Sequence, residues 1–197
     1  MKRFIFLLCA FIIFSCGCKS KRIGYIPDGF FSIDKERNEQ DLKWYVELLG
    51  TLQEPSLYEL SNDTNLNSYR FLWLRTFDNP IALRLSLNED GSAILNIKVA
   101  DGETGFKIGK LIENKTANVT KEQVADFLMV LNQANFWHLP SKEEGGGVDG
   151  AAWILEGVKA GDYHIVVKWA PKEGYFRNAA LFLVTLSNLN IDSNKIY

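Results

Sequence analysis

Two runs of alternating apolar and polar residues, separated by a turn signal, set the strongest limit on how this chain can fold. The first run covers residues 81–88 and the second covers residues 93–99, and in each run every second residue is a larger apolar one, apart from Ala93. Successive side chains of a strand point to opposite faces of a sheet, so each run predicts a strand with one buried face. Asp90-Gly91 lies between the runs and favours a tight turn. Because tight turns join only antiparallel neighbours, the fold is expected to contain an antiparallel sheet.

The flanking segments extend this hairpin to a predicted four-stranded meander. A strand is expected at residues 69–77, and a weaker one at 106–112 after the Asp101-Gly102 turn, with a separate hairpin later at 152–169. Helices are predicted at 35–49, 121–134 and 176–189, and Thr120 with Gln123 has the form of a capping box at the start of the second. This order predicts an α+β fold, in which helices pack on one face of an antiparallel sheet made of the meander and the later hairpin.

The first eighteen residues have the parts of an export signal. Lys2 and Arg3 precede an uncharged apolar run at residues 4–14, which is shorter than the about 20 residues that a membrane-spanning helix needs. The segment resembles the signal of bacterial lipoproteins, in which a cysteine behind a short apolar and small-residue box becomes the lipid-modified first residue. Ile13-Phe14-Ser15-Cys16 fits this box, so the resemblance implies lipidation, for example with palmitate, at Cys16, with Cys18 as the alternative. Ordinary cleavage to a soluble protein is the competing interpretation.

This resemblance implies a location and a division of the chain. Residues 1–18 are the expected signal peptide and lipidation site, residues 19–34 a tether, and residues 35–197 a single globular domain. The domain is expected outside the cytoplasm, at the cell envelope, on the outer membrane if the cell is Gram-negative. With 47% apolar residues, the chain is suited to a packed core. All three cysteines precede residue 19, so no disulfide is expected in the domain.

Charge limits the partners of the domain. The chain has 22 Lys and Arg against 24 Asp and Glu, and loss of Lys2 and Arg3 with the signal leaves it more acidic. A nucleic-acid binder normally carries a basic stripe, and this sequence has none. The expected partners are therefore the membrane, through the N-terminal lipid, and an envelope protein or a small ligand.

The hairpin at 152–169 carries the candidate catalytic residues. A three-residue loop at 159–161 would pair Val158 with Asp162 and set Glu156 opposite His164. This register separates polar from apolar side chains, whereas a one-residue slip would put Glu156 on an apolar face. A carboxylate facing a histidine can raise its pKa and orient it for acid–base catalysis, and Asp149 is a third candidate. A surface contact without a catalytic role is the commoner use of such a pair.

Aromatic residues near this hairpin are candidates for ligand binding. Trp137, His138, Trp153 and Trp169 would line a groove, or would pack in the core instead. The segments Phe136-Trp137, residues 149–153 and residues 169–171 resemble parts of uncharacterised bacterial proteins, a resemblance that implies no activity. The two histidines show no paired metal-ligand spacing, so neither a metal nor another cofactor is expected.

The sequence thus predicts a non-catalytic binding or interaction module at the cell envelope, including the inhibitor or immunity type. Two alternatives remain open at this point. One is an envelope enzyme that uses a Glu156/His164 acid–base pair, and the other is a structural or assembly component of an envelope complex.

Overall fold

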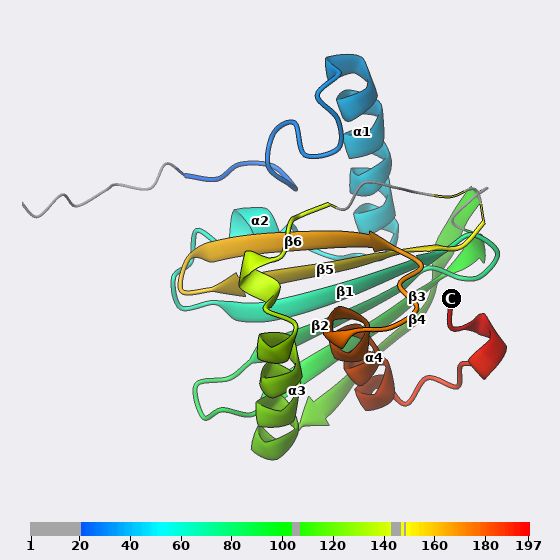
Figure 1. The fold of residues 1–197 in the computed structure, drawn as a ribbon. Coiled ribbons are helices and arrows are strands. Elements are labelled where there is room, and N and C mark those ends of the chain that lie inside the picture. The colour runs from blue at the N-terminus through cyan, green and yellow to red at the C-terminus, as the bar shows by residue number, and fades with distance from the viewer. Residues whose placement is uncertain (1–20, 104–106, 143–146, 148) are drawn as a thin grey trace, which may run out of the picture.

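The computed structural model describes residues 21–103, 107–142, 147 and 149–197. An antiparallel six-stranded sheet with the order β4-β3-β2-β1-β5-β6 forms the centre of the molecule (Figure 1). The predicted α+β fold is confirmed, and so are the meander and the later hairpin, which adds to the free side of β1. The strands are β1 (Asn67–Arg75), β2 (Ile81–Leu87), β3 (Ala93–Glu103), β4 (Lys107–Val119), β5 (Ala151–Lys159) and β6 (Asp162–Trp169).

Two helices cover one face of the sheet, α3 (Lys121–Gln133) and α4 (Tyr175–Ser187). The predicted capping box at the start of α3 is present: the Thr120 hydroxyl accepts from the Gln123 N–H, and the Gln123 side chain accepts from the Thr120 N–H. Phe71 and Trp73 of β1 and Trp153 of β5 pack beneath these helices.

The prediction that all helices lie on one face is wrong. Helix α1 (Lys35–Thr51) and the short α2 (Leu57–Leu60) lie on the opposite side of the sheet (Figure 1). The reason is that β1 is apolar on both faces, since Leu72 and Leu74 are as buried as Phe71 and Trp73. A central strand of this kind needs cover on each side.

The described part of the predicted tether, residues 21–34, lies against the domain. The Arg22 guanidinium donates to the Ser61 hydroxyl and to the main-chain oxygen of Gly161, both at 2.7 Å, and Ile26 is buried. The chain is thereby fastened beside α2 and the β5–β6 turn. The candidate lipidation residues, Cys16 and Cys18, lie outside the described residues. Within the described ranges, no helix is both long and apolar enough to cross a membrane.

Candidate functional site

The β5–β6 hairpin has a different register from the predicted one. Glu156 pairs with Ile165, Gly157 pairs with His164, and the connection is the two-residue turn Ala160-Gly161. The Glu156 and His164 side chains therefore point to opposite faces of the sheet. The acid–base pair expected from the sequence does not form.

The side chain of Glu156 is buried on the α1 face because it meets an arginine of the neighbouring strand. Arg70 of β1 is its direct cross-strand neighbour, with 2.7 Å between Arg70 Nε and Glu156 Oε2. The Tyr163 hydroxyl donates to Glu156 Oε1 at 2.8 Å. Burial and the nearby Glu156 raise the pKa of Tyr163. A paired and hydrogen-bonded carboxylate tolerates burial that an isolated one would not, so the polarity argument for the predicted register fails here.

Three further charged residues complete this buried cluster. Arg84 Nε lies 2.8 Å from Glu54 Oε2, and Lys98 Nζ lies 3.0 Å from Glu54 Oε1. The cluster holds three cations and two carboxylates under α1 and α2, with Arg70 and both glutamates fully or almost fully buried. Burial alone would lower the pKa of Arg70, but Glu156, Tyr45 and Glu54 together outweigh that effect and the pKa is raised. The geometry of the cluster indicates a structural role within the sheet.

His164 lies on the other face, among aromatic rings. Its Nε2 is 3.0 Å from the Leu139 oxygen, and its ring centroid is 5.1 Å from that of Phe136. Burial lowers the pKa of His164, so the neutral ring that donates to Leu139 is favoured. Asp149 is distant. It precedes Ala151, and Ala151 lies six positions before Gly157, the partner of His164, which is about 20 Å along the strand.

Two of the predicted ligand-binding residues line one pocket. Trp137 and His138, in the short 3-10 helix η1 (Phe136–His138), border a hollow of about 300 Å³ together with Tyr69 of β1. Gly157 makes room for this arrangement, since a Cβ there would lie 2.7 Å from Phe136. The other two residues lie elsewhere. Trp153 is fully buried in the core, and Trp169 is partly exposed, with its indole nitrogen against Gly147 and Gly150.

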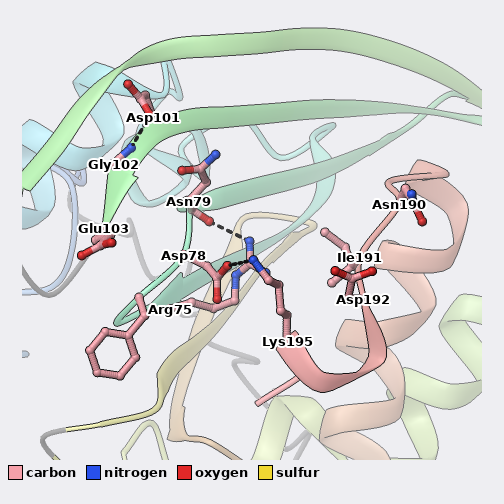
Figure 2. A pocket seen from close by; sticks show the side chains of 11 residues that line it. Arg75, Asp78, Asn79, Asp101, Gly102, Glu103, Asn190, Ile191, Asp192 and Lys195 are labelled. Atoms are coloured by element: carbon pink, nitrogen blue, oxygen red, sulfur yellow. Dashed lines mark hydrogen bonds and ion pairs between the residues drawn. The ribbon is translucent and has the colours of Figure 1, made fainter.

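Six charged residues line a cavity at the C-terminal end of β1. We call this cavity the Arg75 cleft, and Figure 2 shows it. It has a volume of about 420 Å³ and is formed by the end of β1 with the following turn, the end of β3, and the C-terminal segment 190–195. A second hollow of about 430 Å³ adjoins it and shares Arg75, Asn79, Asn190 and Ile191. The lining residues of the cleft are Arg75, Phe77, Asp78, Asn79, Asp101, Gly102, Glu103, Asn190, Ile191, Asp192 and Lys195.

Arg75 is the unusual member of this lining. It is 96% buried, and its guanidinium carbon lies 4.6 Å from the centre of the Trp73 ring. One Nη donates to the main-chain oxygen of Asn79 at 2.9 Å, whereas Nε has no hydrogen-bond partner among the described residues. A buried N–H without a partner costs about 1–3 kcal/mol, which an incoming acceptor would recover. Burial lowers the pKa of Arg75, although nearby Asp78 opposes this effect.

Asp78 ties the C-terminal segment to the sheet beside Arg75. Lys195 Nζ lies 2.7 Å from Asp78 Oδ1 (Figure 2). The Tyr197 hydroxyl donates to Asp78 Oδ2 at 2.9 Å. Burial raises the pKa of Asp78, but these two hydrogen bonds and the charges of Arg75 and Lys195 together outweigh it and the pKa is lowered. The main-chain oxygen of Tyr197 also accepts from the indole N–H groups of Trp73 and Trp153. These contacts hold the wall of the cleft in place.

Sequence reasoning missed this site. One signal was available: Arg75 directly follows the apolar run at residues 71–74, where a charged side chain requires either a partner or a ligand. The C-terminal segment gave no signal, because residues 188–197 show no periodicity, and Lys195 and Tyr197 bond to residues that lie 44 to 124 positions earlier in the chain. Among the described residues, no group of three or more His, Cys, Asp or Glu is placed to hold a metal ion.

Comparison with known proteins adds no assignment. No protein-family model matches the chain, and no curated protein matches it.

Proposed function

We propose that this protein is a cell-envelope lipoprotein whose domain is a non-catalytic binding module, and that its ligand binds in the Arg75 cleft. The observation that carries the proposal is Arg75 itself, a buried cation in the wall of a cavity, whose Nε–H lacks an acceptor in the part of the chain that the structure describes. Preformed cavities of about 300–1,000 Å³ with a few convergent polar groups are typical of ligand sites. The envelope location rests on the lipoprotein-like signal.

The position of the cleft agrees with this proposal. Arg22 fastens the N-terminal segment beside the β5–β6 turn, where Lys159 pairs with Asn67 at the start of β1. Arg75 is the last residue of the same strand, and eight residues of β-strand span about 26 Å. The start of the described chain and the cleft therefore lie at opposite ends of the sheet (Figure 1). The cleft would stay accessible on a membrane-attached protein.

The enzyme alternative loses its geometric basis, because Glu156 and His164 face opposite sides of the sheet. An inhibitor or immunity role is a form of binding that would use the same cleft as a docking point for a partner side chain.

Lipidation is tested by metabolic labelling with an alkyne-tagged palmitate in the native host. We expect label on the wild-type protein and on Cys18→Ser, and none on Cys16→Ser. Loss of label only in Cys18→Ser would move the lipid to Cys18. An unlabelled wild-type protein would contradict the lipoprotein proposal.

Binding is tested by native mass spectrometry of the purified protein incubated with the small-molecule fraction of an envelope extract. We expect a retained compound on the wild type that Arg75→Gln loses and Arg37→Gln keeps. Arg37 is the matched control because its side chain is 77% exposed on α1. Circular dichroism establishes that Arg75→Gln is folded, and if it is not, Asn190→Ala replaces it as the cleft variant. Retention by all the variants, or no retained compound at all, would contradict the proposed site.

A further inference from the structure

We infer that the ligand of the Arg75 cleft is a zwitterion of the amino-acid type, bound with its carboxylate at Arg75 and its ammonium group among the carboxylates of the rim. This inference rests on the proposed function and specifies the chemistry of the same site. Both proposals require that a ligand binds in the Arg75 cleft. The experiment described below can show that the zwitterion inference fails while the binding proposal stands.

The inner wall of the cleft calls for an acceptor. Arg75 Nε has no acceptor among the described residues, and Lys195 extends toward the same point, as Figure 2 shows. The carboxylate of Asp78 lies beside them, and both of its oxygens are already engaged, one by Lys195 and one by Tyr197. A carboxylate is the acceptor that an arginine binds most strongly, because two parallel N–H groups can meet its two oxygens.

The rim of the cleft has the opposite character. Asp101 and Glu103 lie at the end of β3, and Asp192 lies on the C-terminal segment across from them, all three of them exposed (Figure 2). Gly102 N–H donates to Asp101 Oδ1 at 2.9 Å, which leaves the second oxygen of that carboxylate for other contacts. Three carboxylates around one opening favour a cation there.

The charges of the residues that line the cleft argue against a simple anion and against a simple cation as the ligand. The lining contains two cations, Arg75 and Lys195, against four carboxylates. A simple anion would approach through the negative rim, and a simple cation would leave the N–H of Arg75 without an acceptor beside a second positive charge. A molecule with a carboxylate at one end and an ammonium group near it satisfies both regions. The volume of about 420 Å³ accommodates a free amino acid or a short peptide.

The test is isothermal titration calorimetry of the folded, delipidated chain at pH 7. The ligands are the free α-amino acids and a set of dipeptides. Each is compared with its N-acetyl form, which lacks the cation, and with its C-terminal amide, which lacks the carboxylate. We expect at least one zwitterion to bind and both blocked forms to bind at least tenfold more weakly. Glu103→Gln and Asp192→Asn should each weaken binding several-fold. Asp126→Asn is the matched control on the exposed side of α3 and should leave the affinity unchanged.

The outcomes separate the two proposals. Equal affinity for the N-acetyl form would overturn the role of the acidic rim, and equal affinity for the amide would overturn the carboxylate contact at Arg75. If no compound of the panel binds while the extract still supplies a ligand that depends on Arg75, the zwitterion inference fails and the binding module stands. If the extract supplies none either, both fail.

Discussion

The pairing of Arg70 with Glu156 makes a quantitative prediction about stability. We consider Arg70→Met, Glu156→Gln and the double variant. Arg70→Met leaves the Glu156 carboxylate in the sheet without its cation, and both side chains have no exposure to solvent. Removing one partner of a buried ion pair costs about 3–5 kcal/mol. Glu156→Gln keeps an acceptor for Tyr163 but leaves three cations facing the Glu54 carboxylate alone.

The double variant should recover much of this loss. Without Arg70 and Glu156, the cluster keeps Arg84, Lys98 and Glu54, so its net charge remains the same as in the wild type. We therefore expect the double variant to be more stable than the sum of the single effects predicts, with a coupling free energy of about 2 kcal/mol or more. For a domain of this size, the loss in Arg70→Met corresponds to a Tm decrease of roughly 6–20 °C.

The assay is urea unfolding followed by circular dichroism and tryptophan fluorescence, with coincident transitions as the check for two-state behaviour. The matched control is the exposed pair Lys35–Glu39 on α1. The cycle of Lys35→Met and Glu39→Gln should give a coupling below about 0.5 kcal/mol. Two results would refute the assignment of this pair as an essential element of the sheet. One is that the effects of Arg70→Met and Glu156→Gln are additive. The other is that each single variant loses less than about 1 kcal/mol of stability, which is the order of magnitude for surface changes.

Three further predictions concern the β5–β6 hairpin. Ala160 has a φ of 50° beside Gly161, so Ala160→Asn should raise the free energy of unfolding by about 1 kcal/mol, because asparagine adopts this backbone region more readily; a lower urea midpoint would contradict the turn geometry. At Gly157 an added Cβ would lie 2.7 Å from Phe136, so Gly157→Ala should lower the stability by about 1–3 kcal/mol, and an unchanged thermal midpoint would show that the aromatic cluster is loosely packed. The pKa of His164 is lowered by burial, so the unfolded chain takes up this proton first, and stability falls as pH decreases through about 6.5, the ordinary histidine pKa. An NMR titration should place the pKa of His164 below that value, and His164→Gln should remove part of the pH dependence.

The local elements of the fold were accessible from the sequence because their signals are local. The alternation in residues 81–99 specifies two strands and their turn, and the capping box at Thr120 specifies where α3 begins. The helix on the opposite face was misplaced for a different reason. Nothing within residues 35–49 tells which face of a sheet the helix will cover, and only the two-sided burial of β1 decides it.

The register of the β5–β6 hairpin shows the limit of a local argument. Segregation of polarity would be decisive if Glu156 had no partner, since an unpaired buried carboxylate is costly. Its partner Arg70 lies 86 residues earlier in the chain, and the two meet only when β5 adds to β1. The same dependence on distant segments conceals the Arg75 cleft, whose walls come from three separate parts of the chain.

Two arginines of β1 explain why the cleft is the better candidate for function. Arg70 and Arg75 are five residues apart and therefore point to opposite faces of the same strand. The fold surrounds Arg70 with Glu156, Glu54 and the Pro55 oxygen. Arg75, almost as deeply buried, receives one main-chain oxygen and an aromatic ring. The fold supplies several acceptors to the buried guanidinium of Arg70, so the same fold could also have supplied acceptors to that of Arg75. Within the described ranges no acceptor reaches the Nε–H of Arg75, which lies in the wall of a cavity, and this agrees with the proposal that a ligand supplies the acceptor.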